Sequence, residues 1–312
     1  MLENSMNIIF MGTPEFAVPS LQAIHQKFGV SAVVTVPDKP QGRGMKLTPS
    51  AVKIAALELG LPVLQPELLK SEQFRNEIEA LNPDIIVVIA FRILPASIYT
   101  LATLGAFNIH GSLLPKFRGA APINWAIING EKESGVTSFL LNDKVDTGKI
   151  LRKRTCQITE TMTAGELYSE LMPLAAELAV ETCILLSEGN AVPIPQDDTI
   201  ATPAPKLFRE NCSIDWTKSA RDVKNFVRGV NPSPIAWVMW DDKRLKVYTV
   251  EVENKTLPTG AWKIENGKFI VGCGDGNSVS LLEIQQEGKP KMSVDIFLRG
   301  YRGVSEGFYS LN

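Results

Sequence analysis

Asn108 and His110 are the two side chains of this sequence best suited to chemistry. They stand two residues apart in Gly105-Ala-Phe-Asn-Ile-His-Gly111, and residues two apart on a β-strand point to the same side. The sequence contains one other histidine, His25. When a nucleophile attacks a carbonyl group, negative charge develops on the oxygen, and an amide or imidazolium donor held nearby lowers the barrier. This pair therefore indicates acyl transfer.

Asp146, within Val145-Asp-Thr-Gly148, is the candidate third member of this set. A carboxylate beside an imidazole would fix its tautomer and favour its charged form. No serine, cysteine or lysine in this neighbourhood has an obvious activating base, so we favour direct attack by a substrate amine over a covalent enzyme intermediate. The alternative is that His110 is a structural histidine at a strand end and Asp146 a turn former, since structural networks also bring such groups together.

The first half of the chain alternates short apolar stretches with helical patterns, which is typical of a parallel sheet with crossover helices. The predicted strands are 7–11, 31–36, 84–91, 105–110 and 135–141, and the predicted helices are 50–59 and 71–81. In such a sheet ligands bind at the carboxyl ends of the strands, where the Asn108 segment and the loop after Phe91 would lie. Only Gly12-Thr-Pro14 follows the first strand, so a Gly-x-Gly-x-x-Gly site for a nicotinamide cofactor is not expected.

The second half contains a long helical pattern, a proline-rich stretch and a series of short strands. Pro173 should kink the helix predicted over 163–189 or divide it in two. The stretch 190–205 has four prolines and indicates an extended linker. A short helix over 219–230 and a small barrel are expected after it. The predicted barrel strands are 235–240, 245–252, 260–264, 269–273 and 278–284. The predicted divisions are a domain over 1–189, a linker over 190–206 and a domain over 207–312.

Six segments extend the pattern around Asn108 along essentially the whole chain. They are 7–19, 37–44, 108–130, 146–148, 214–216 and 228–234. The set of Asn108, His110, Ser112-Leu-Leu-Pro115 and Asp146 resembles the 10-formyltetrahydrofolate-dependent formyltransferases, a superfamily that includes purine-pathway and sugar formyltransferases. The other segments narrow the resemblance to the branch that formylates methionyl initiator tRNA.

The resemblance implies an α/β fold, with a doubly wound, mostly parallel, Rossmann-like formyltransferase sheet followed by an OB-like β-barrel that binds tRNA. It also implies that Asn108, His110 and Asp146 are catalytic and that 10-formyltetrahydrofolate is the co-substrate, with no metal. The acceptor would be the α-amino group of methionyl initiator tRNA, formylated for translation initiation. A purine-pathway or sugar formyltransferase remains a competing interpretation, as does a non-catalytic RNA-binding protein that retains the cleft.

The same resemblance places Ser112-Leu113-Leu114-Pro115 against the folate, with Phe91-Arg92 in a loop that encloses the pterin. Leu113 and Leu114 would fit an ordinary hydrophobic core equally well. The sequence departs from the common family pattern at Phe91-Arg92, where Tyr-Gly is usual, and at Val145, which replaces a leucine. These departures leave the shape of the pterin pocket open.

Lys39, Arg43 and Lys46 form a basic group on a loop with two glycines. Charge alone favours an ordinary solvated loop, whereas the resemblance implies a loop that enters the acceptor end of the tRNA, with Arg43 matching the arginine of the family. Residues 206–312 carry 16 Lys and Arg against 13 Asp and Glu, and the remainder carries 16 against 21. The predicted barrel is thus the basic part of the chain, which fits contacts to phosphates.

The composition bounds the class of protein. The 312 residues, 45% hydrophobic and 21% charged, suffice for a full core and for two domains. The four cysteines form no Cys-x-x-Cys pair, which predicts neither a zinc knuckle nor a disulfide framework and fits a reducing cytoplasm. No apolar run approaches the roughly 18 residues of a membrane span, and residues 1–6 do not read as a signal peptide; Met6 is an alternative start. We expect a cytoplasmic monomer.

Overall fold

The computed structural model of the chain describes residues 6–41 and 46–309. Two compact units emerge. Unit 1 comprises Met1–Pro122, Glu133–Cys156 and Tyr168–Ala204, and unit 2 comprises Ile123–Lys132, Gln157–Leu167 and Pro205–Asn312. Part of the proline-rich stretch thus groups with unit 1, and two short segments before it group with unit 2. The domain boundaries at 189 and 206 stay a prediction.

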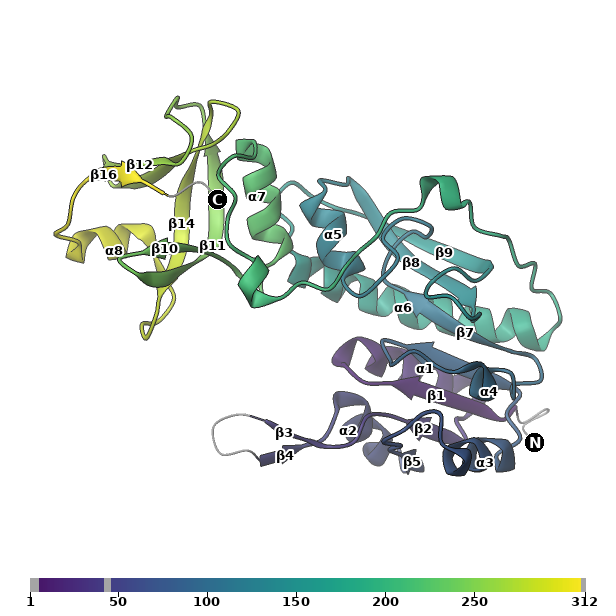
Figure 1. Cartoon of the computed structure of the whole chain (residues 1–312). Coiled ribbons are helices and arrows are strands. Elements are labelled where there is room, and N and C mark those ends of the chain that lie inside the picture. The colour runs from purple at the N-terminus through teal and green to yellow at the C-terminus, as the bar shows by residue number, and fades with distance from the viewer. Residues whose placement is uncertain (1–5, 42–45, 310–312) are drawn as a thin grey trace. The chain divides into compact units, whose positions relative to one another are not determined.

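Unit 1 is built on a seven-stranded sheet with the order β5-β2-β1-β6-β7-β8-β9 (Figure 1). The strands are β1 Ile8–Gly12, β2 Ala32–Val34, β5 Val63–Leu64, β6 Ile85–Ile89, β7 Gly105–His110, β8 Glu133–Leu140 and β9 Ile150–Gln157. The pairings from β5 to β7 are parallel, whereas β8 is antiparallel to β7. All residues of β1 and β6 are buried, as expected for strands covered on both faces. The predicted mostly parallel sheet is confirmed.

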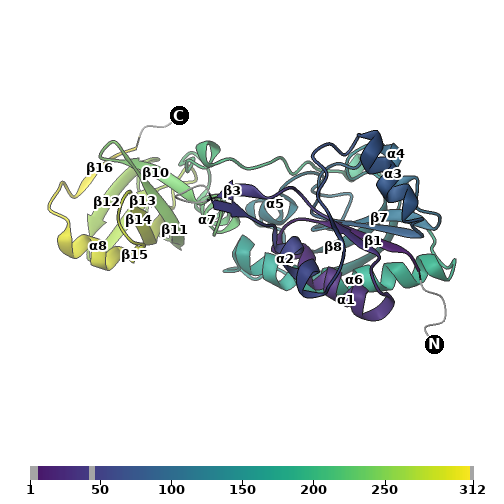
Figure 2. The same cartoon turned by 90° about the horizontal axis from the view of Figure 1, so that it is seen from below.

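Helices cover both faces of this sheet. Figures 1 and 2 show α1 and α6 on one face, and α3 and α4 on the other. The helices are α1 Val18–Phe28, α2 Ala51–Glu58, α3 Glu72–Ala80, α4 Ala96–Tyr99 and α6 Ala164–Ser187. The side chains of Ser50 and Ser71 cap α2 and α3 by accepting from backbone N–H groups three residues on, which satisfies a donor of the first turn. Pro173 lies inside α6, which continues as one helix.

The register of the parallel strands brings several polar segments to one edge. Gly12 is paired with Ile89, and Ile89 with Ile109. The residues that follow β1, β6 and β7 therefore leave the sheet side by side at its carboxyl edge. Ligands bind at this edge in open α/β sheets, so the fold places the His110 segment at the edge where chemistry is expected.

Unit 2 contains an antiparallel half-barrel with the strand order β10-β11-β14-β13-β12-β16, and β15 pairs with β14. The strands are β10 Ala236–Trp240, β11 Lys243–Glu253, β12 Ala261–Glu265, β13 Lys268–Gly272, β14 Ser278–Gln286, β15 Met292–Ser293 and β16 Glu306–Phe308, and the helices are α5 Pro122–Ile128, α7 Ala220–Gly229 and α8 Val294–Gly300. A register shift between Val247 and Val250 interrupts the β11–β14 ladder, and such bulges let a sheet curve. The rings of Trp240, Trp262 and Phe269 pack together inside. The predicted fold class is confirmed.

Several elements of the structure were not predicted from the sequence, among them a hairpin and an edge strand. The basic stretch predicted as a loop contains two short antiparallel strands, β3 Lys39–Gln41 and β4 Lys46–Thr48. These two strands form a hairpin. The strand β9 was not predicted because Arg152, Lys153 and Arg154 hide its apolar pattern. Charged residues are common on edge strands, where they discourage further pairing. Within the described ranges no helix is both long and apolar enough to cross a membrane.

Candidate active site

Asn108 and His110 both lie on β7. Because they are two residues apart on one strand, their side chains leave the same face of it. His110 is the last residue of the strand and only 7% exposed, whereas Asn108 is half-buried. Asn108 pairs through its backbone with Val88 and Phe139 of the flanking strands. Among the described residues its side-chain amide has no hydrogen-bond partner. The amide is thus available to a ligand.

The imidazole of His110 is held through one nitrogen. Its Nε2 lies 2.8 Å from the carbonyl oxygen of Phe117. Because a carbonyl only accepts, Nε2 carries a hydrogen and donates it. The other nitrogen, Nδ1, lies 3.8 Å from Oδ2 of Asp146, which is beyond hydrogen-bond length. The residue that fixes the tautomer is therefore Phe117, and Nδ1 is the nitrogen left without a hydrogen bond to any described residue.

Asp146 occupies a tightly determined turn. Its φ of +53° is in the left-handed region, which Asp adopts more readily than most residues, and its Oδ2 accepts a 2.9 Å hydrogen bond from the backbone N–H of Gly119. At Gly148 a Cβ atom would lie 1.6 Å from the carbonyl oxygen of Leu140, so only glycine fits there. These constraints aim the Asp146 carboxylate at His110.

The arrangement can stabilise a developing oxyanion and move a proton. The Asn108 amide and a protonated Nδ1 of His110 are donors of the kind that polarise a carbonyl group. The side chains of His110 and Asp146 are 8% and 11% exposed, and low exposure strengthens their mutual electrostatic interaction. Within the described ranges no group of three or more His, Cys, Asp or Glu side chains is placed to hold a metal ion.

Comparisons with known proteins identify the family. The formyl transferase family model matches residues 6–183, and the model of the formyl transferase C-terminal domain matches residues 206–302. A methionyl-tRNA formyltransferase of Caldanaerobacter subterraneus is 47% identical, over 97% of this chain and 99% of the relative. A second, from Parabacteroides distasonis, is 42% identical over 98% and 99%.

The chain belongs to the methionyl-tRNA formyltransferase family. The resemblance found in the sequence is therefore confirmed, and the protein is an enzyme of a family that uses 10-formyltetrahydrofolate as formyl donor. Solved structures share its fold. An N-formyltransferase from Helicobacter canadensis, in complex with folinic acid and dTDP-3-aminofucose, has a TM-score of 0.69 at 20% identity, over 90% of this chain and 99% of that one. HypX from Aquifex aeolicus, in complex with tetrahydrofolic acid, has a TM-score of 0.61 at 19% identity, over 98% and 51%.

The Ser112-Leu-Leu-Pro115 segment of this formyltransferase is mostly buried. The Ser112 hydroxyl donates to the carbonyl oxygen of Lys116, 2.7 Å away, and Leu114 packs against Phe139 and Ile150 in a small core cluster. Leu113 is half-buried, the most accessible of the four residues. The segment thus shapes the turn that leads from His110 to Phe117, and its predicted contact with folate stays a prediction.

Phe91 and Arg92, the departure from the family pattern, are both half-buried. The Arg92 guanidinium donates to the carbonyl oxygens of Glu67 and Pro66, at 2.9 and 2.7 Å, and lies 5.3 Å from the centroid of the Phe91 ring. Burial lowers the pKa of this guanidinium. The charge of Arg92 is therefore engaged by the backbone of a neighbouring loop.

The predicted tRNA loop of the formyltransferase is only partly described. Lys39 is exposed on β3. Lys46 begins β4, and Arg43 lies outside the described residues. At the base of this hairpin Asp38 accepts two hydrogen bonds from Nζ of Lys53, at 2.9 and 2.8 Å, and these bonds hold the pKa of the Asp38 carboxyl below its usual range. The base of the hairpin is thus anchored to α2.

Two polar side chains beside the site were missed by sequence reasoning. Gln196 and Arg118 hydrogen-bond to each other and border the Asp146 turn. Arg118 lies within the segment 108–130 that carried the family resemblance. Gln196 lies in the proline-rich stretch, whose composition indicated a linker and gave no sign of a role in the site.

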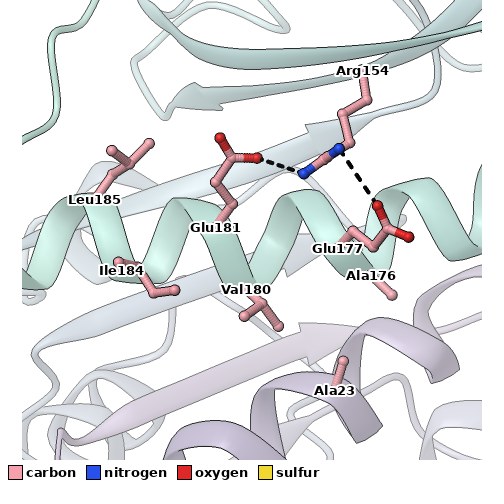
Figure 3. A pocket seen from close by; sticks show the side chains of 8 residues that line it. All are labelled: Ala23, Arg154, Ala176, Glu177, Val180, Glu181, Ile184 and Leu185. Carbon is pink, nitrogen blue, oxygen red and sulfur yellow. Dashed lines mark hydrogen bonds and ion pairs between the residues drawn. The ribbon is translucent and has the colours of Figure 1, made fainter.

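A separate apolar pocket lies away from the site, between α1, α6 and β9 (Figure 3). It is lined by Ala23, Arg154, Ala176, Glu177, Val180, Glu181, Ile184 and Leu185. At its polar border Arg154 forms ion pairs with Glu177 and Glu181. None of Asn108, His110 and Asp146 lines this pocket, so it is not where the predicted chemistry would occur.

Proposed function

We propose that this chain transfers the formyl group of 10-formyltetrahydrofolate to the α-amino group of methionyl initiator tRNA, with Asn108, His110 and Asp146 as the catalytic residues. The observation that carries the proposal is the contact between His110 and Asp146, 3.8 Å apart, at the end of the strand that bears Asn108. The full-length relatives named above are methionyl-tRNA formyltransferases, which supports the same acceptor for this chain.

The chemistry requires a free amine. An α-amino group has a reference pKa of about 8, and the adjacent ester lowers this pKa. A substantial fraction of the amino groups is therefore unprotonated without a strong base. The amine nitrogen forms a bond to the formyl carbon, and the bond between that carbon and the folate nitrogen N10 breaks. The proton lost by the amine replaces the formyl group on N10.

Asn108 and His110 stabilise the oxygen of the formyl group while it carries negative charge. The Asn108 amide is free to donate for this purpose, since no described residue occupies it. His110 donates from Nδ1, because its Nε2 hydrogen is already given to Phe117. Asp146 stabilises the charged imidazole and keeps its orientation, and His110 or a water molecule relays the proton to the departing nitrogen.

The folate would be held beside this trio. Ser112-Leu-Leu-Pro115 and Phe91-Arg92 would form the walls. Two apolar side chains that are neighbours in sequence of Arg92 and Asp146, Ile93 and Val145, are 77% and 52% exposed. Exposed apolar side chains at a polar site fit a flat aromatic ligand, because such ligands are bound by apolar walls with a few polar contacts. The residues present therefore fit the pterin of the formyl donor.

The tRNA would contact the segment that bears Lys39, Arg43 and Lys46, together with the basic part of the chain, residues 206–312. Phosphate contacts depend on local Lys and Arg side chains and make binding sensitive to salt. We also propose that the protein acts as a monomer in the cytoplasm, which fits the cysteine pattern and a substrate made there.

One assay tests the function. Purified protein is mixed with 10-formyltetrahydrofolate and either methionyl initiator tRNA, uncharged initiator tRNA, methionyl elongator tRNA, an amino-sugar nucleotide or glycinamide ribonucleotide. We expect formylation of the charged initiator alone. Formylation of the sugar or ribonucleotide instead would identify another branch of the superfamily. Binding of tRNA without any turnover would identify an RNA-binding protein with an inactive cleft.

A further inference from the structure

The proline-rich stretch is attached to the site by hydrogen bonds within unit 1. Ile194 pairs with Ile150, through two backbone hydrogen bonds of 2.8 Å. Arg118 forms a parallel bridge with the end of the stretch, since its N–H donates to the carbonyl oxygen of Thr202 and its carbonyl oxygen accepts from the N–H of Ala204. The two ends of residues 194–204 are thus fixed to the strand after the Asp146 turn and to the turn after His110.

Gln196 lies between these two attachments and joins the two turns with its side-chain amide. Its Nε2 donates to the carbonyl oxygens of Asp146 and Gly148, at 2.9 and 2.8 Å. Its Oε1 accepts from Nε and Nη2 of Arg118, at 3.1 and 2.8 Å. All four hydrogen-bonding contacts of one amide are therefore spent on the turns that flank the site.

Arg118 stands between the two residues that touch the catalytic pair. Phe117, before it, accepts from Nε2 of His110, and Gly119, after it, donates to Oδ2 of Asp146. The position of Arg118 therefore sets the positions of both contacts. Gln196 thus connects Arg118 to the backbone of Asp146 by hydrogen bonds that involve the side chain of neither His110 nor Asp146.

We propose that Gln196 is a positioning residue for formyl transfer, which holds the Asp146 carboxylate at its working distance from His110. The inference rests on the proposed function. An amide suits this position because it both donates to two carbonyl groups and accepts from a guanidinium. A carboxylate accepts only, so it would keep Arg118 and repel the two carbonyl oxygens.

The test is Gln196→Glu, which preserves size and the contact with Arg118. Misplacement of catalytic groups by about 1 Å costs on the order of 100-fold, so we expect kcat to fall about 10- to 100-fold while KM for the folate and for the tRNA stays within about twofold. Gln22→Glu, at an exposed position of α1, is the matched control and should equal the wild type. If Gln196→Glu does not fold, Gln196→Met, a neutral side chain of similar length, takes its place.

A double-mutant cycle separates positioning from a structural effect. In an Asp146→Asn background the Gln196→Glu substitution should change kcat less than about twofold, because residues that act through one another are non-additive. Multiplication of the two losses would overturn the inference, as would a kcat for Gln196→Glu within twofold of the wild type or a loss confined to KM. An inactive wild type, or a fully active Asp146→Asn enzyme, would instead contradict the proposed function.

Discussion

His110 in unit 1 and Arg228 in unit 2 are equally buried, each 7% exposed, yet their surroundings differ. Arg228 on α7 donates to the side chain of Asn225 and to the carbonyl oxygens of Thr159 and Met162, and burial lowers the pKa of its guanidinium. His110 has one hydrogen bond, and its Nδ1 faces a carboxylate at 3.8 Å. Equal burial therefore accompanies a guanidinium whose donors are engaged in unit 2 and an imidazole in unit 1 with one nitrogen free of hydrogen bonds to the described residues. The second arrangement is the one expected of the proposed catalytic histidine.

The largest expected effect comes from Asp146→Asn. The substitution keeps the size of the side chain and its contact with Gly119 but removes the charge opposite His110. Loss of the orienting carboxylate should lower kcat about 10³-fold, between the loss for an oxyanion donor and that for the carboxylate partner of a catalytic histidine. Steady-state formylation measures it, with Asp143→Asn in the same loop as a nearly neutral control. A kcat within tenfold of the wild type would remove Asp146 from the mechanism.

Arg228→Met should affect stability and leave the chemistry unchanged. The substitution removes the donor from three acceptors, one of them on the buried Asn225, and breaking such a cluster costs about 3 kcal/mol in the free energy of unfolding. Denaturant titration measures this cost, and kcat per folded molecule should stay that of the wild type. Arg221→Met is the control on the same helix, because the Arg221 side chain is 65% exposed in its pair with Glu160 and should contribute less than about 1 kcal/mol. If Arg228→Met had the stability of the wild type but a much lower kcat, Arg228 would be a functional residue and not a structural one.

The smallest effect is expected from Lys39→Gln, because Lys39 belongs neither to the surroundings of His110 nor to those of Arg228. If the hairpin contacts phosphates, KM for the tRNA should rise a few-fold and the dependence of log affinity on log salt should weaken by about 0.7 to 0.9. Binding measured at several salt concentrations gives this slope. Lys27→Gln, at an exposed position of α1, should change neither quantity. An unaltered slope for Lys39→Gln would make the hairpin an ordinary solvated one.

Much of the sheet could be predicted from the sequence because its signal is local. The apolar runs of β1 and β6 and the short pattern of β7 are each contained within a few residues. The register of the parallel strands then brings the ends of these strands together. The strand β9 was not predicted because three basic residues in succession interrupt its apolar pattern. The hairpin of β3 and β4 was not predicted because glycines and charged residues are typical of loops.

The contacts that complete the site could not be predicted in this way. Gln196 reaches partners 50 and 78 residues away in sequence, and no periodic pattern records such a contact. The proline content indicated an extended linker, and this stretch also contains a 3-10 turn over Asp198–Ile200 and contacts the Asp146 turn. The role of Phe117 as the acceptor for His110 was likewise invisible, because a backbone carbonyl is present at every residue.

Asn108→Ala tests the central claim most directly, because the Asn108 amide has no structural task among the described residues that its loss would disturb. Single-turnover formylation of methionyl initiator tRNA, with the enzyme in excess, isolates the chemical step. We expect a rate about 10²- to 10³-fold lower than that of the wild type, which is the typical cost of losing one oxyanion donor, at an unchanged melting temperature. Asn190→Ala, at an exposed position, should react at the wild-type rate. A folded Asn108→Ala enzyme that also reacts at that rate would contradict the account.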